Sequence, residues 1–216
     1  MELESEYELV MEVIILGDAS VGKSNVMLRY VQNKFEENSL PTIGCDYMKV
    51  NKSFQGKKFL IKFWDTAGQE KYRALSKNFY EKADAVILVY DVTNRRSLEN
   101  ADFWLKEISN SCKKEIKLLL LGNKNDLLDD RQVSKEEGWS WADKERCFYM
   151  EASAKTNNEL RVNRAIDELL ADRAAYLLKK EEERTNRETL VIKKEIDSIP
   201  IKGVKHRISN QQNCCK

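Results

Sequence analysis

An apolar run ends directly in a loop with a glycine at each bend, and this junction limits what the chain can fold into. The run VIIL is followed by GDASVGKSN, residues 17–25, and then by a helical pattern. A strand, a short glycine-containing loop and a helix in this order are typical of sheets whose parallel strands are joined by crossover helices. We therefore expect an α/β domain with this loop at the end of a strand.

The other apolar runs predict the same architecture. Six segments have the pattern of strands, namely residues 9–16, 46–54, 57–64, 85–91, 117–122 and 148–151. Three of them are nearly all apolar, as strands covered on both faces must be. Only Gln55 and Gly56 separate the second strand from the third, which predicts a hairpin. The expected fold is a six-stranded, mostly parallel sheet with one antiparallel edge strand and helices on both faces.

Helical patterns fill the gaps between these strands. Ser134 and Glu137 predict a capping box at the start of one helix. A second helix is predicted after a cap at Ser97, with apolar residues at helical spacing at Leu98, Ala101, Leu105 and Ile108. Gly138 falls inside the first of these helices, where a glycine costs about 1 kcal/mol relative to alanine. The sequence offers no functional reason for this glycine.

Length and charge indicate one domain with a tail of different character. The chain has 216 residues, 42% of them hydrophobic, which is enough for one compact core. We expect an extension over residues 1–8, the domain over 9–180 and a flexible tether over 181–216. The net charge of +1 predicts no nucleic-acid partner, and it leaves −3 for the first 199 residues because residues 200–216 carry four basic residues and no acid.

Composition also excludes several kinds of site. The acidic N-terminus and the lack of a long apolar run predict a cytoplasmic chain. His206 is the only histidine and lies in the tail, so the body cannot hold a Ser-His-Asp triad, a two-histidine zinc site or a histidine general base. Cys45, Cys112 and Cys147 are scattered, and we expect free thiols.

The loop at residues 17–25 has the spacing of a phosphate-binding loop, with Gly17 and Gly22 followed by Lys23 and Ser24. The amides of residues 20–25 would point into a concavity at a helix N-terminus, a site that favours phosphate oxygens. Lys23 would reach the β- and γ-phosphates, and the Ser24 hydroxyl would hold Mg²⁺. This loop alone fits adenylate kinases, ATPases and GTPases equally.

A second loop indicates which base is bound. NKND, residues 123–126, follows the apolar run KLLLLG, at a strand end where open α/β sheets bind ligands. The Asp126 carboxylate can accept hydrogen bonds from N1–H and the 2-amino group of guanine, and adenine offers neither donor. We therefore expect discrimination against ATP on the order of 10⁴.

With three further motifs, these loops resemble the Ras-like small GTPases over about residues 9–178. The motifs are LPTIG at 40–44, WDTAGQE at 64–70 and EASAK at 151–155. The chain looks most like the Rab branch, on TIGCDY, WDTAGQEKYRAL, FYEKAD, LVYDVT and GNKNDL. The resemblance implies a GTP hydrolase that cycles between GDP and GTP states as a membrane-tethered switch in vesicle trafficking, and that hydrolyses GTP slowly unless an activating protein stimulates it.

The resemblance also implies a role for individual residues. Mg²⁺ would be held by Ser24, Thr42 and Asp65, the last through water. Catalysis would depend on Gln69, which orients the attacking water, together with Lys23 and Thr42. The residues implied to bind GTP or GDP are Ala19, Ser20, Val21, Gly22, Lys23, Ser24, Asn25, Phe35, Thr42, Gly68, Asn123, Lys124, Asp126, Ser153, Ala154 and Lys155. A core position is the alternative for Phe35.

Two departures from the family pattern concern hydrolysis. Ala19 stands where glycine or serine is commoner, and Ser39 stands where an aromatic residue often covers the phosphates. They leave open a GTP-binding scaffold with little or no hydrolysis. A phosphate-loop kinase of a small metabolite is a third possibility, but it would need an acceptor lid and several arginines that we do not find.

The chain ends in Cys214, Cys215 and Lys216, and Asn213 stands where a farnesylation-type box needs cysteine. The doubled cysteine resembles the Rab-type geranylgeranyl acceptor, with unmodified thiols as the alternative. Two lipid chains, helped by nearby basic residues, would hold the protein on the cytosolic face of an intracellular membrane. The implied partners are an exchange factor, an activating protein that supplies a catalytic arginine, effectors that read the switch segments and a prenyl-protein chaperone.

Overall fold

The structure is a computed structural model, and it describes residues 7–38, 42, 45–66, 80–112 and 115–197. The strands are β1 (Leu9–Leu16), β2 (Cys45–Phe54), β3 (Lys57–Thr66), β4 (Ala85–Asp91), β5 (Lys117–Asn123) and β6 (Phe148–Glu151). The helices are α1 (Lys23–Gln32), α3 (Arg95–Glu99), α4 (Ala101–Ser111), α5 (Lys135–Lys144), the 3₁₀ helix η3 (Asn158–Leu160) and α6 (Arg161–Asp197).

The six strands form one sheet in the order β2-β3-β1-β4-β5-β6. Only the β2–β3 pair is antiparallel, and its register runs from Cys45 opposite Thr66 to Phe54 opposite Lys57. Gln55 and Gly56 join these strands with positive φ angles of 49° and 80°, as a tight two-residue hairpin turn requires. The predicted sheet, with its antiparallel edge, is therefore confirmed.

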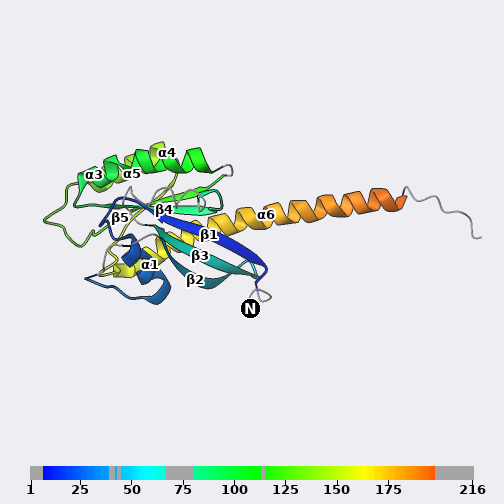
Figure 1. Ribbon diagram of the computed structural model, residues 1–216, viewed down its shortest axis with the longest axis horizontal. Helices are drawn as coiled ribbons and strands as arrows, with labels where there is room; N and C mark the ends of the chain where they lie inside the picture. The colour runs from blue at the N-terminus through cyan, green and yellow to red at the C-terminus, as the bar shows by residue number, and fades with distance from the viewer. Residues whose placement is uncertain (1–6, 39–41, 43–44, 67–79, 113–114, 198–216) are drawn as a thin grey trace, which may run out of the picture. The chain divides into compact units, whose positions relative to one another are not determined.

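Helices cover both faces of the sheet (Figure 1). On one face, α1 meets the first part of α6, where the Tyr30 hydroxyl donates to Asp167 Oδ1 at 2.6 Å. On the other face, α4 and α5 lie together, and Trp141 Nε1 donates to Asp102 Oδ1 at 2.7 Å. All seven residues of β4 are buried, because this strand lies inside the sheet and is covered on both sides.

The helix cap predicted at Ser97 is wrong. The helix begins earlier, at Arg95, with Asn94 as its N-cap residue, and α4 starts anew after Asn100. Ser97 is buried, and its hydroxyl accepts a hydrogen bond from the Asp91 amide at 3.0 Å and donates to the Asn94 carbonyl at 2.6 Å. Its side chain therefore ties α3 to the end of β4 instead of starting a helix.

The glycine inside α5 has a packing reason. A Cβ atom at Gly138 would lie 2.5 Å from the hydroxyls of both Tyr90 and Tyr149. These hydroxyls are 3.2 Å apart, and Tyr149 also donates to Glu151. The capping box predicted at Ser134 is present at the start of the same helix. Gly138 thus lets α5 approach a polar cluster beneath it.

The first part of α6 is anchored by a buried ion pair. Arg173 is only 2% exposed, and its Nη2 lies 3.0 Å from Asp84 Oδ1. Its Nη1 donates to the carbonyl of Glu115 at 3.0 Å, and Asp84 Oδ2 accepts from the amide of Glu12 at 2.9 Å. The guanidinium group therefore connects α6 to the residues that precede β4 and β5, and Asp84 extends this network to β1.

The chain divides into two compact units, Met1–Leu177 and Leu178–Lys216. Helix α6 continues to Asp197, so the flexible tether predicted from residue 181 is helical over its first seventeen residues. This stretch is rich in strong helix formers, and Arg184–Glu188 and Glu183–Arg187 pair at four-residue spacing. No helix in the described part of the chain has the length and apolar composition of a membrane span.

Candidate nucleotide-binding site

A cavity of about 560 Å³ opens where β1 and β5 end. Its wall contains fourteen of the predicted ligand-binding residues: Ala19, Ser20, Gly22, Lys23, Ser24, Asn25, Phe35, Thr42, Asn123, Lys124, Asp126, Ser153, Ala154 and Lys155. Val21 is buried in the core instead, and Gly68 and Gln69 lie outside the described residues. Phe35 faces the cavity and is not a core residue. The structure therefore gathers four separate sequence motifs at one edge of the sheet.

Two glycines shape the loop between β1 and α1. Gly17 has a φ of 137°, and a Cβ atom there would lie 2.1 Å from the carbonyl oxygen of Val89. Gly22 has a φ of 95°, and a Cβ atom would lie 2.4 Å from Nδ2 of Asn123. Only glycine combines these φ angles with such close approaches. The loop can therefore fold back tightly over the ends of two neighbouring strands.

Lys23 reaches back along this loop from the first turn of α1. Its Nζ donates to the carbonyls of Gly17 and Asp18 at 3.0 and 2.7 Å. The side chain is 6% exposed, and burial lowers the pKa of Lys23 to about 8, although the charges of Asp65 and Asp18 oppose this shift. A phosphate would add further negative charge next to this buried ammonium group and would stabilise its charged form.

The N-terminus of α1 presents further donors to the same cavity. The N-cap residue, Gly22, has no side chain that could cap this end, and no acidic residue occupies the first turn. Amides at the start of a helix have no intrahelical acceptors, and the helix dipole adds partial positive charge there. Together with Lys23, this helix end favours an anion.

Three oxygen-bearing side chains from separate segments converge beside Lys23. The Ser24 hydroxyl donates to Asp65 Oδ2 at 2.5 Å and lies 3.0 Å from Thr42 Oγ1, which is 3.3 Å from the same carboxylate oxygen. The other oxygen, Asp65 Oδ1, is buried and has no hydrogen-bond partner among the residues that the structure describes. Two hydroxyls and a carboxylate with a free buried oxygen are a donor set that fits Mg²⁺.

Asp65 is held in an environment that disfavours its charge. Burial raises the pKa of this carboxyl group, while the hydrogen bond from Ser24 and the charge of Lys23 act in the opposite direction. A divalent cation would stabilise the ionised form. The group is therefore prepared for a cation and costly to keep charged without one.

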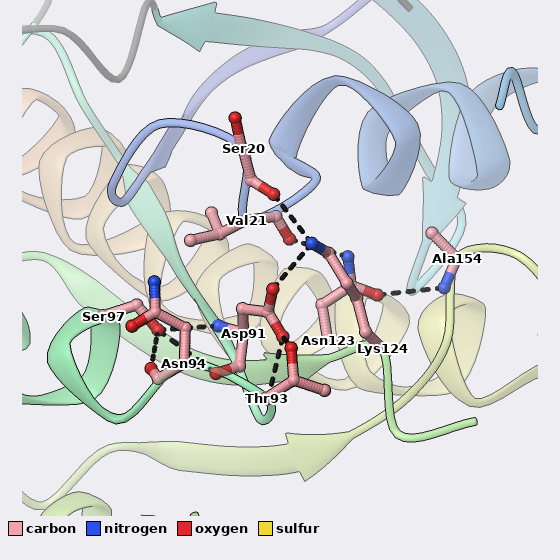
Figure 2. A network of polar contacts seen from close by, with 9 residues as sticks. All are labelled: Ser20, Val21, Asp91, Thr93, Asn94, Ser97, Asn123, Lys124 and Ala154. Atoms are coloured by element: carbon pink, nitrogen blue, oxygen red, sulfur yellow. Dashed lines mark hydrogen bonds and ion pairs between the residues drawn. The ribbon is translucent and has the colours of Figure 1, made fainter. Parts of the chain in front are cut away.

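Asn123 joins the two ends of the cavity (Figure 2). Its Nδ2 donates to the Val21 carbonyl at 2.9 Å, and its Oδ1 accepts from the Ala154 amide at 3.0 Å. The side chain is 2% exposed. One amide group thus fixes the phosphate loop against the loop that follows β6.

Lys124 adds a second connection from the same strand end. Its Nζ donates to the Ser20 carbonyl at 2.9 Å and lies 2.6 Å from Asp91 Oδ2. Figure 2 shows how Asp91 in turn receives two hydrogen bonds from Thr93, through its amide and its hydroxyl. Lys124 therefore lies between the phosphate loop and a carboxylate at the end of β4. The sequence did not single out Asp91 for this role.

The base end of the cavity contains Asp126, which is half-buried, and the loop 153–155. Ser153 is buried, and its hydroxyl accepts from the amides of Lys155 and Thr156, each at 3.1 Å. These bonds hold the loop as a turn. Asp126 and Ala154 line the same cavity, as recognition of guanine requires.

Sequence reasoning missed several residues of the site. Glu37 and Leu127 line the cavity, and Asp18 anchors the phosphate loop by accepting from Asn100 Nδ2 at 2.6 Å and Trp104 Nε1 at 2.9 Å. Glu37 lies two residues from Phe35, so proximity was the available signal. The contacts of Asp18 join segments more than 80 residues apart, and no short motif encodes them.

A phosphate loop after β1 and the NKND loop after β5, at the same edge of such a sheet, define the class of phosphate-loop GTPases. The comparison with known families agrees, because the profile described as the Ras family matches residues 12–174. The chain belongs to the Ras family and is a small GTPase of the Rab type, a GTP hydrolase. A metabolite kinase is thereby excluded.

Individual relatives support the same assignment. The Ras-related protein RABA1b of Arabidopsis thaliana is 41% identical over 152 residues, which cover 70% of each chain. The Ras-related protein SEC4 of Candida albicans is 38% identical over 71% of this chain and 73% of its own. The Ras-related protein RABA2b of Arabidopsis thaliana is 32% identical over 99% of this chain and 97% of its own. The similarity to RABA2b therefore extends into the C-terminal segment.

Proposed function

We propose that this GTP hydrolase works as a switch that cycles between GDP and GTP states and directs vesicle traffic from the cytosolic face of an intracellular membrane. The observation that carries the proposal is the single cavity that joins a phosphate loop to a base loop through Asn123. A nucleotide bound there would contact both loops at once. Its phosphates would lie next to the segment of Thr42, so the presence of the γ-phosphate would be communicated to that segment.

The proposed chemistry assigns separate tasks to the residues of the cavity. Lys23 and the amides of α1 would bind and orient the phosphates, and Asp126 would select guanine. Ser24, Thr42 and Asp65 would hold Mg²⁺, which neutralises charge on the phosphate oxygens when it is bound. Gln69 would orient the attacking water. Its position lies outside the described residues, so this role rests on the family pattern alone.

Hydrolysis is proposed to be slow without a partner. No arginine occurs between Arg29 and Arg73, and none lines the cavity among the described residues. We expect an intrinsic rate on the order of 10⁻⁴ per second, typical of the family, rising about 10⁵-fold when an activating protein supplies an arginine. A single-turnover assay would test this, and an unaided rate near one per second would contradict it. Gln69→Leu should keep the protein in its GTP state.

The first experiment identifies the nucleotide that the purified protein carries. After denaturation, chromatography should show GDP or GTP in near-stoichiometric amount. Asp126→Asn should remove it, because an amide offers a donor where guanine also presents donors. Asp129→Asn, at an exposed carboxylate three residues away, is the matched control and should retain the nucleotide. An adenine nucleotide in the wild-type protein would overturn the proposed base recognition.

Membrane attachment is proposed from the C-terminus. Cys214 and Cys215 would carry geranylgeranyl groups, and a prenyl-protein chaperone would then hold the lipidated protein in the cytosol between membrane visits. An exchange factor, an activating protein and effectors that read the switch segments complete the proposed partners. Intact-mass measurement of protein from its native cells tests the anchor, and a mass without added isoprenoid would refute it. The control is Cys214→Ser with Cys215→Ser, which should show the unmodified mass.

A further inference from the structure

The side chain of Asn25 holds a short segment in place that contains Phe35. This segment, residues 34–37, is called the Phe35 segment below. Asn25 Nδ2 donates to the Glu36 carbonyl at 2.9 Å, and Asn25 Oδ1 accepts from the Glu36 amide at 2.8 Å. Both backbone groups of one residue are thereby paired with one side chain. Because Asn25 belongs to the first turn of α1, the Phe35 segment is fixed to the helix that presents the phosphate donors.

An ion pair joins the Phe35 segment to the loop 153–155, which is called the base loop below. Lys155 Nζ lies 2.7 Å from Glu37 Oε1, although the two residues are 118 positions apart. Both residues line the cavity. Their contact lowers the pKa of Glu37 and raises that of Lys155. The ion pair therefore connects the two segments between which a nucleotide would have to enter and leave the cavity.

Arg29 also holds the base loop, through hydrogen bonds to its backbone carbonyls. Its Nε donates to the Ala154 carbonyl at 2.8 Å, and its Nη2 donates to the Lys155 carbonyl at 3.0 Å. Its Nη1 donates to the carbonyl of Asn33 at 2.8 Å, just before the Phe35 segment begins. One planar guanidinium group thus sets the distance between the end of α1 and the base loop.

We propose that Glu37 and Lys155 form a latch over the bound guanine nucleotide, positioned by Asn25 and Arg29, and that opening this latch is part of nucleotide release. The proposal rests on the nucleotide site proposed above. For the base to leave, the Phe35 segment must separate from the base loop, and the ion pair must break as it does so. The latch residues are exposed, so the effect is modest and sensitive to salt.

The test measures release of GDP labelled with a fluorophore on its ribose, chased by excess unlabelled GDP. With Glu37→Gln, release at low ionic strength should be about two- to fivefold faster than in the wild type, the range expected for an exposed ion pair. Glu37→Lys should release faster still, because it places two cations together. At about 1 M salt, where the screening length is about 3 Å, the wild type and Glu37→Gln should converge.

A matched control separates the latch from a general loss of charge. Glu36→Gln removes the same charge one residue away, where only the backbone is held, and its release rate should equal that of the wild type. Arg29→Lys keeps the charge of the positioning residue, but it replaces three nitrogen atoms that reach three separate carbonyls with a single nitrogen atom, so its faster release should persist at high salt.

Two failures can be told apart. A protein that retains no guanine nucleotide overturns the proposed site and the latch with it. A protein that retains GDP, but whose Glu37→Gln variant releases it at the wild-type rate at low ionic strength, overturns the latch alone. The latch is equally wrong if the Glu37→Gln effect has the same size at low and high salt.

Discussion

The hydroxyl oxygen of Ser24 lies 2.5 Å from Oδ2 of Asp65, so the start of α1 and the end of β3 meet at one carboxylate. Thr42 Oγ1 lies 3.3 Å from the same oxygen. Since Asp65 Oδ1 has no hydrogen-bond partner in the described part of the chain, this buried group has capacity left for one further contact. A cation bound there would hold three separate segments together, which links its binding to that of the nucleotide.

Asp65→Asn should weaken Mg²⁺ binding by about 10- to 100-fold, as expected for a residue that acts on the metal through another ligand. The measurement is GDP release as a function of free Mg²⁺, where the midpoint should move to higher concentration. Asp129→Asn is the control, and its midpoint should stay in place. An unchanged midpoint for Asp65→Asn would show that this carboxylate does not contribute to the metal site.

Gly138→Ala should destabilise the protein, although alanine is the better helix former. The added methyl group would meet the hydroxyls of Tyr90 and Tyr149 at 2.5 Å. Such overpacking costs about 1–3 kcal/mol, more than the roughly 1 kcal/mol gained in helix propensity. Urea denaturation of the GDP-bound protein measures the difference. Adding Tyr149→Phe should recover part of the loss, and a stabilised Gly138→Ala protein would show that α5 can shift freely.

Arg173→Ala should lower the free energy of unfolding by about 3–5 kcal/mol, because it leaves the buried Asp84 carboxylate without its cation. The double variant Arg173→Met with Asp84→Asn removes both charges and should regain most of this stability. Denaturant midpoints of the two proteins decide the matter. If the single and double variants are equally destabilised, the guanidinium contributes through packing and not through charge.

We expect the contribution of Glu137 to the stability of the folded protein to depend on pH. The hydrogen bonds from Arg95 and from the Ser134 backbone lower the pKa of Glu137 from 4.5 to about 2. The stabilisation is therefore complete above pH 4.5 and is lost as the pH falls towards 2, because the unfolded chain takes up a proton first. Thermal unfolding should show Glu137→Gln less stable than the wild type at pH 7, with the difference disappearing near pH 2. A Glu137→Gln variant that differs from the wild type by the same amount at pH 7 and near pH 2 would contradict this contribution.

The sequence predicted the elements of the fold well, because strands covered on both faces and glycine loops leave local patterns. It predicted neither the helix over residues 181–197 nor the early start of α3. In the first case, the lack of hydrophobic periodicity concealed a helix supported by propensity and ion pairs. In the second, the Ser97 hydroxyl could either cap a helix or bond to the backbone at the end of β4. The structure shows the second arrangement.

The candidate site was predictable wherever one motif carries the chemistry, as with Lys23 and Asp126. The contacts that join motifs were not. Glu37 with Lys155 and Asp18 with Trp104 each connect distant segments, and only the folded chain brings them together. The reason for Gly138 was hidden in the same way, because its neighbours Tyr90 and Tyr149 come from two other elements.

The side chain of Asn123 sets the distance between two loops of the cavity. Its two ends are bonded to the Val21 carbonyl and the Ala154 amide, so the span between the phosphate half and the base half is set by the length of one amide group. In the proposed site, a ligand would have to be long enough to contact both loops. Guanine alone, without ribose and phosphates, would reach only the loop that follows β6.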